Sequence, residues 1–256
     1  MAADGVPSNI VGYNTVTLDK AWTIVGFNFE ECGTGPRSLQ ELFPYTEGMT
    51  KSNVADFADC IQVQNAGGTY DIYFMSNGKN AKGTADVSGI NEKWVVSGGT
   101  TLANPSFEPG TAFWYLARKP DPSFQLALAG QALTSVSSNV TINLSMKHIA
   151  NPYATDLSLQ ELIPYTVGMT KSNVSDFADC IQIQNAGGTY DIYFMSNGKN
   201  AKGTGDVAGI DEKWVVSGGT TLASDSVVIP GGRGAWYLRR GGASFEITVA
   251  RPFSLD

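Results

Sequence analysis

The chain of 256 residues contains a single histidine, His148, which limits the chemistry that it can perform. Nucleophilic mechanisms of the Ser/His or Cys/His type need a positioned imidazole that takes a proton from the nucleophile. His148 lies in a segment that we predict to be a strand, and the matching position of an earlier, similar segment is Ile24. We therefore expect no histidine-dependent active site and assign no catalytic residue.

Two carboxylate pairs, Asp56/Asp59 and Asp176/Asp179, are the remaining acid–base candidates. A glycosidase needs two carboxyl groups that face one cleft at a separation of about 5 to 9 Å. The same side chains are also suited to capping and solvating a short helical turn, and we favour this interpretation. A carboxylate-based glycosidase is the third functional hypothesis, and we expect a protein that is not an enzyme.

Oxygen-bearing side chains gather in one segment that could bind a hard cation. They are Asp86, Asn91 and Glu92, which recur as Asp206, Asp211 and Glu212. The segment lacks the alternating ligands of a calcium-binding loop. Cys60 and Cys180 each open a predicted strand, where we expect a small buried side chain rather than a metal ligand or half of a disulfide. We expect no metal and no cofactor.

One predicted strand has a mixed face that could bind a ligand. Asp71, Tyr73 and Met75 share this face, and Asn77 begins an Asn-Gly turn. An aromatic ring can pack on the apolar face of a sugar while carboxylate and amide groups bond to its hydroxyls. The possible ligand-binding residues are Tyr73, Asp71, Asn77, Tyr193, Asp191 and Asn197, with one site per copy. Tyr70, Trp94, Trp114 and Tyr115, with their equivalents in the second copy, are further aromatic candidates, most of which we expect to fill a core.

These residues belong to a sequence that is duplicated. Residues 38–103 recur as 158–223, and 59 of the 66 positions are identical. A repeat of this length is a whole domain rather than one turn of a solenoid. We therefore predict two domains, residues 1–133 and 134–256.

Each copy is a series of short strands separated by turn signals. Val140, Ile142 and Leu144 alternate with polar residues, as in a half-buried strand, and Gly-Gly and Asn-Gly pairs mark tight turns. Ser38 and Glu41 form a capping box that predicts a short helix. A second turn is expected from Ser52 to Ala58, with Val54 and Phe57 three residues apart on one apolar face. The fold class is therefore all-β: two tandem, near-identical β-sandwich or small-barrel domains with short covering helices.

Composition restricts the partners. The formal net charge is −7, which disfavours nucleic acid and anionic membranes, and no apolar run is long enough for a membrane-spanning helix. We expect no nucleic acid partner and no membrane insertion. The start, Met1 to Asp4, fits either a mature N-terminus after signal-peptide removal or an ordinary cytoplasmic start; we favour the first, and an extracellular or cell-surface location.

Three segments of the first copy carry a family resemblance. Ala21 to Phe29, Asp59 to Val63 and Pro109 to Leu116 resemble the G-W-N-L-I-G-N-P-F, A-D-x-I-Q-x-W and P-G-x-G-F-W-L segments of uncharacterised bacterial secreted tandem β-repeat domains. The second copy departs from this pattern, with Met146 and His148 in place of Trp22 and Ile24. The resemblance implies a secreted or cell-surface β-domain and supplies no catalytic residues.

The leading functional hypothesis is a non-enzymatic, self-assembling extracellular protein of a filament, layer or matrix. Duplicated surfaces favour two-point association, and contacts that do not close produce fibres or sheets. We expect self-association through the strand edges at Thr15 to Leu18 and Phe245 to Val249. The alternative is a carbohydrate- or ligand-binding module with one site per repeat.

Overall fold

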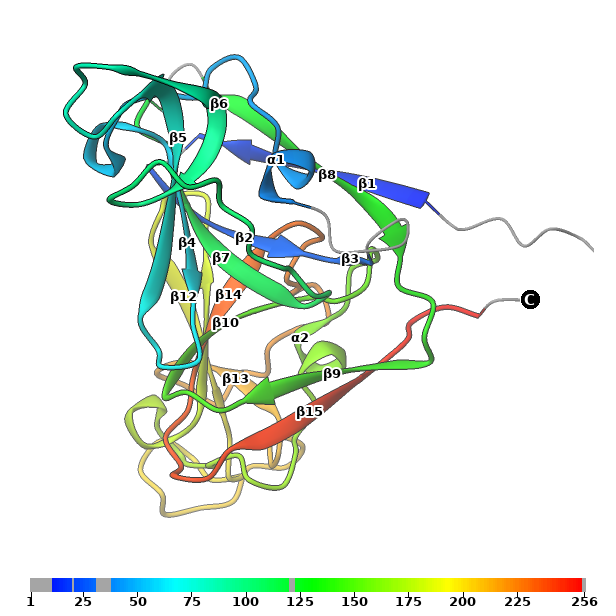
Figure 1. The fold of residues 1–256 in the computed structure, drawn as a ribbon. Helices are drawn as coiled ribbons and strands as arrows, with labels where there is room; N and C mark the ends of the chain where they lie inside the picture. The colour runs from blue at the N-terminus through cyan, green and yellow to red at the C-terminus, as the bar shows by residue number, and fades with distance from the viewer. Residues whose placement is uncertain (1–10, 20, 31–37, 120–122, 255–256) are drawn as a thin grey trace, which may run out of the picture.

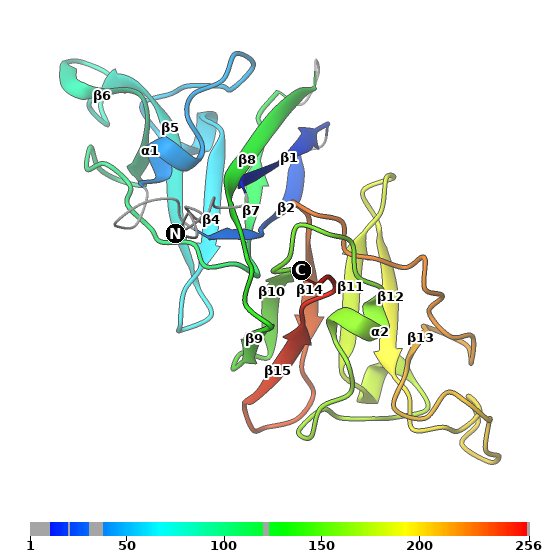
Figure 2. The ribbon, with the colours of Figure 1, turned by 90° about the vertical axis from the view of Figure 1, so that its right-hand side faces the viewer.

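The computed structural model describes residues 11–19, 21–30, 38–119 and 123–254 (Figure 1). It confirms the all-β fold class: antiparallel strands dominate, and the helices are short. The two halves of the chain form two separate groups of strands that meet at the centre of the molecule (Figure 2). The Met1 to Asp4 start lies outside the described residues.

The first domain is built from a five-stranded and a three-stranded antiparallel sheet. The larger sheet has the order β2 (Trp22–Phe27), β7 (Thr111–Leu116), β4 (Cys60–Gln64), β5 (Tyr70–Lys79) and β6 (Asp86–Val96). The smaller sheet has the order β1 (Val11–Leu18), β8 (Phe124–Ala132) and β3 (Phe29–Glu30). Consecutive side chains of a strand point to opposite faces, so each sheet of the pair contributes one face to a shared core.

The second domain repeats the plan with shorter strands. Its larger sheet has the order β10 (Met146–Ala150), β14 (Gly234–Leu238), β11 (Cys180–Gln184), β12 (Tyr190–Met195) and β13 (Trp214–Val216). Its smaller sheet pairs β15 (Phe245–Ala250) with β9 (Ser137–Ile142). Residues 133–136 join the domains, and Leu133 already packs in the second core.

A short helix closes each core. The helices α1 (Leu39–Leu42) and α2 (Leu159–Leu162) begin with the predicted capping box, which Ser38 and Glu41 form in the first copy. Gln40 then holds α1 against the sheet, since its side-chain amide bonds to both the N–H and the C=O of Trp94, each at 2.7 Å. The indole of Trp94 is fully buried and donates to the carbonyl of Phe43 at 2.6 Å. In the described part of the chain, no helix is long and apolar enough to cross a membrane.

The predicted second helical turn is smaller than expected. The segment forms only the 3₁₀ turns η1 (Ala55–Phe57) and η2 (Ser175–Phe177). Phe57 is 71% exposed, so the predicted apolar face of Val54 and Phe57 is not buried. The chain here is fixed by the buried residues Ala58 and Cys60 that follow, rather than by packing of a helix.

The two strand edges expected to be open differ from each other. β1 pairs with β8 on one side, and its Thr17 carbonyl accepts a hydrogen bond from the Arg233 guanidinium of the second domain at 3.0 Å. β15 pairs only with β9 among the described strands, whereas its counterpart β8 pairs with both β1 and β3. The outer edge of β15 is therefore the less covered of the two.

Candidate functional site

The two domains pack through the outer faces of their larger sheets. In β2, Val25 and Phe27 face the core of the first domain, while Ile24 points the other way and packs with Ala112 and Ala150. Strands β2 and β7 consequently lie against β10 and β14 at the centre of the molecule (Figure 1). We call this contact the seam.

The seam has approximate two-fold symmetry. The Gln64 side chain donates to the Met146 carbonyl at 2.8 Å, and Gln184, its copy, donates to the Trp22 carbonyl at 3.0 Å. Main-chain bonds repeat the relation: Gly26 donates to the Gly232 carbonyl at 2.9 Å and Ala150 to the Gly110 carbonyl at 3.0 Å. Such reciprocal contacts are those of a symmetric dimer, here within one chain.

Glycine allows the two sheets to approach closely. A Cβ atom on Gly26 would lie 2.3 Å from the Arg233 carbonyl oxygen and 2.6 Å from the Ala150 Cβ. A Cβ atom on Gly234 would lie 2.6 Å from the Ala112 Cβ. All three distances are too short for real atoms, so the seam depends on glycine at both positions.

An aromatic groove of about 430 Å³ runs along the seam. Its lining combines partly buried and exposed aromatic rings with glutamine amides and carries no charged side chain. The lining residues are Trp22, Gln62, Tyr70, Trp114, Gln184, Gly188 and Tyr190. Trp22 is 38% exposed and packs edge-on against Trp114, with ring centroids 5.6 Å apart. Trp114 in turn lies 5.9 Å from its copy Trp236.

The symmetry of the seam fails at two positions that matter for the groove. Trp22 has Met146 as its counterpart, so only one side of the seam carries this exposed indole. Ile24 has His148 as its counterpart, and the His148 ring lies 3.8 Å from Trp236 and 5.5 Å from Trp114. His148 is 3% exposed, and neither ring nitrogen has a partner among the described residues. Burial lowers its pKa to about 3, so this ring is neutral.

The carboxylate pair of the glycosidase hypothesis does not face one cleft. Asp59 is 1% exposed; its carboxylate accepts from the Tyr115 hydroxyl at 3.0 Å and from the Arg118 N–H at 2.8 Å. Desolvation raises the Asp59 pKa, which these bonds oppose. Asp56 lies exposed in η1. Asp59 therefore anchors β7 to the start of β4.

The cation candidates are engaged in ion pairs. Lys79 bonds to Asp86 at 2.8 Å and Lys51 to Glu92 at 2.6 Å. Within the described ranges, no group of three or more His, Cys, Asp or Glu residues lies close enough to hold a metal ion. Cys60 is free, buried and the first residue of β4, as expected, and burial raises its pKa to about 11.

The six predicted ligand-binding residues lie apart from the groove. Tyr73 pairs with Ile61 and packs against the first core, and its copy Tyr193 is 9% exposed in the second core. The exposed Asp71 accepts from Asn65 at 3.2 Å, and Asp191 is exposed in the same way. The Asn77 and Asn197 side chains each cap the N–H of the lysine two residues later, at 3.2 Å. None of the six lines a cavity described here.

Sequence reasoning named Tyr70 and Trp114 and the copy Tyr190 as aromatic candidates but missed Trp22, Gln62 and Gln184. One available signal was β2 itself, Trp22-Thr23-Ile24-Val25-Gly26-Phe27, which has apolar residues on both faces. A strand of this kind is covered on both sides. Comparison of the chain with protein-family models, with curated proteins and with solved structures found no match to any of them.

Proposed function

We propose that this protein is a non-enzymatic, extracellular carbohydrate-binding protein whose ligand occupies the aromatic groove of the seam. The main support is the lining itself, in which one exposed indole and several half-buried indole and phenol rings stand beside glutamine amides at the boundary of two domains. Ligand sites occur preferentially at domain boundaries, with mainly apolar walls and a few polar groups that fix orientation.

The groove favours a neutral sugar over a charged one. Indole and phenol rings pack on the apolar C–H face of a pyranose, and the Gln62 and Gln184 amides can both donate to and accept from its hydroxyls. None of the lining side chains is charged. The site also needs both domains, because Trp22 and Gln184 come from different copies. The duplication thus creates one shared site per chain, in place of the single site per repeat expected from the sequence.

Replacing Trp22 by alanine is expected to weaken retention on a bound polysaccharide at least tenfold, because the exposed ring of the groove is lost. Met146→Ala is a matched control: Met146 occupies the counterpart position and is 40% exposed, against 38% for Trp22. The measurement is affinity electrophoresis in gels that contain neutral polysaccharides. Equal losses in the two variants, or no retention of the parent chain on any neutral glycan, would refute the proposal.

Self-assembly is the second candidate function, and two observations favour it. The outer edge of β15 has no partner among the described strands, and Phe57 and its copy Phe177 are each 71% exposed. Two identical apolar contacts per chain allow association in open arrays.

Sedimentation over a hundredfold concentration range tests this candidate. We expect ordered polymers of the parent chain at high concentration and a monomer for the double variant Phe57→Ala plus Phe177→Ala, since each exposed ring would be removed from a contact. Asp56→Ala plus Asp176→Ala, which removes exposed polar neighbours, is the control. A parent chain that stays monomeric at every concentration rules the assembly function out.

A further inference from the structure

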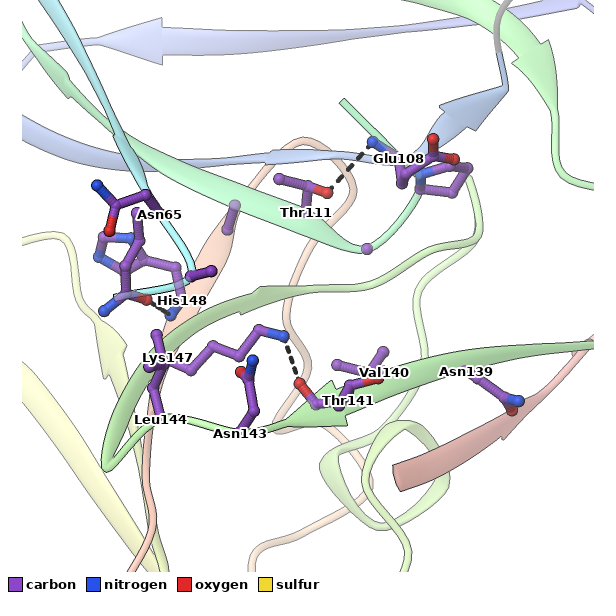
Figure 3. Close-up of a pocket in the computed structure, with 15 residues that line it drawn as sticks. Asn65, Glu108, Thr111, Asn139, Val140, Thr141, Asn143, Leu144, Lys147 and His148 are labelled. Atoms are coloured by element: carbon purple, nitrogen blue, oxygen red, sulfur yellow. Dashed lines mark hydrogen bonds between the residues drawn. The ribbon is translucent and has the colours of Figure 1, made fainter. Parts of the chain in front are cut away.

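A second cavity, of about 390 Å³, opens on the seam between the start of β7 and the β9–β10 hairpin (Figure 3). In contrast to the aromatic groove, its lining includes charged side chains, since Lys147 and Glu108 lie beside His148. Amide and hydroxyl groups complete the lining: Gln64, Asn65, Asn139, Asn143, Thr111 and Thr141. We call it the polar cavity.

The polar cavity exists because the seam symmetry is broken at Thr111. Gly110 and Gly232 occupy equivalent positions, so Thr111 is the counterpart of Arg233. On the other side of the seam, the half-buried Arg233 side chain extends to the Thr17 carbonyl and occupies the equivalent space. Threonine is several atoms shorter and leaves that space open on this side.

Lys147 takes the place of the missing guanidinium at the equivalent carbonyl of this side of the seam. Its ammonium donates to the Thr141 carbonyl, and Thr141 is the counterpart of Thr17. Figure 3 shows the lysine side chain extending along the β9–β10 hairpin to this carbonyl, with Glu108 on the opposite side of the cavity. Lys147 is half-buried and forms no ion pair within the described ranges, so two of its three N–H donors remain for a ligand. Burial lowers its pKa, as expected for a cation without a counter-ion.

His148 adds a second group without a partner. It lines the polar cavity, it is 3% exposed, and both ring nitrogens lack a hydrogen-bond partner among the described residues. Buried polar atoms normally have a hydrogen-bond partner. Two ring nitrogens without one, beside a cavity, mark a position at which a ligand or a bound water would be stabilised.

We propose that the polar cavity binds a monosaccharide unit that carries a carboxylate, such as a uronic acid, with the carboxylate on Lys147 and the ring hydroxyls on the surrounding amides. A charge-assisted hydrogen bond to a half-buried ammonium is stronger than one between neutral groups. The exposed side chains of Asn139 and Asn143 each offer a donor and an acceptor, as sugar hydroxyls require. The exposed Glu108 on the far side disfavours a second negative charge, which limits the ligand to one carboxylate near Lys147.

Titration calorimetry with glucuronate, glucose and acetate tests this site on the full chain. We expect glucuronate to bind at least tenfold more tightly than glucose, which lacks the carboxylate, and than acetate, which lacks the hydroxyls. Equal affinity for acetate would overturn the sugar assignment, and equal affinity for glucose would overturn the role of Lys147.

The residues at the counterpart positions define a variant that should fill the polar cavity. Thr111→Arg combined with Lys147→Thr copies the residues that stand at the counterpart positions, Arg233 and Thr23, and is expected to abolish glucuronate binding while the fold is kept. Lys147→Met, which keeps the length of the side chain, is expected to reduce binding at least tenfold. Trp22→Ala should leave glucuronate binding unchanged, which separates this site from the aromatic groove. Undiminished binding by both Lys147 variants would refute the proposal.

Discussion

Replacing Gly26 by alanine is expected to lower the free energy of unfolding by about 3 kcal/mol, the upper part of the range for overpacking a well-filled contact. The added methyl would lie 2.3 Å from the Arg233 carbonyl oxygen, a main-chain atom that cannot rotate away. The Ala150 methyl, 2.6 Å from the same point, blocks a shift in the other direction. The two sheets must therefore separate, and the bond from the Gly26 N–H to the Gly232 carbonyl is lost with the contact.

Small-angle scattering and urea unfolding measure the two consequences of Gly26→Ala. The radius of gyration should increase as the domains separate, and retention on neutral polysaccharide should fall with it, because Trp22 and Gln184 no longer face each other. Gly99→Ala is the control: it adds the same methyl at a position with no contact closer than 3.9 Å. A Gly26→Ala chain as compact and stable as the control would show that the seam does not hold the domains together.

The strands and turns of each domain could be predicted because their signals are local. The alternation of Val140 and Ile142 with polar residues reflects one buried face, and the capping box of Ser38 and Glu41 satisfies the first amides of α1 without help from distant residues. The Ser52 to Ala58 segment forms less helix than predicted. A three-residue spacing of apolar residues such as Val54 and Phe57 indicates a helical face only where another element covers it.

The candidate site could not be predicted, because it forms between residues far apart in the sequence. The sequence places Tyr73 on a face with Asp71, but only the structure shows that Tyr73 packs against the first core while Asp71 stays exposed. Trp114 differs from its neighbours Phe113 and Tyr115 by pointing into the seam, which depends on the second domain. The two asymmetric positions, Trp22/Met146 and Thr111/Arg233, lie outside the near-identical segments 38–103 and 158–223, and only the packing of the two domains shows that they border a groove and a cavity.

Replacing His148 by isoleucine is expected to remove a pH dependence from the stability of the protein. The pKa of His148 is about 3 in the folded chain and about 6.5 in the unfolded chain. Between these values the unfolded chain binds a proton that the folded chain does not, so the free energy of unfolding falls as the pH falls. The loss is about 1.4 kcal/mol per pH unit below 6.5, or about 3 kcal/mol at pH 4. Isoleucine has no proton to bind and is the residue at the counterpart position, Ile24, so the seam can accept it.

Urea unfolding of the parent chain and of His148→Ile from pH 8 to pH 4 isolates this effect, because the carboxylates of the chain titrate alike in both. The difference in stability should be constant above pH 7 and grow in favour of isoleucine below it. The rings packed on His148 are those of Tyr70, Trp114 and Trp236, none of which titrates in this range. The other titratable groups of the polar cavity, Glu108 and Lys147, are present in both chains. If the stability of the two chains fell in parallel with pH, the His148 imidazole would gain a proton without leaving its site. Such protonation requires a route by which water or an anion reaches the ring. The polar cavity, which His148 lines, is that route, so the shape of the difference curve also reports whether the cavity is hydrated.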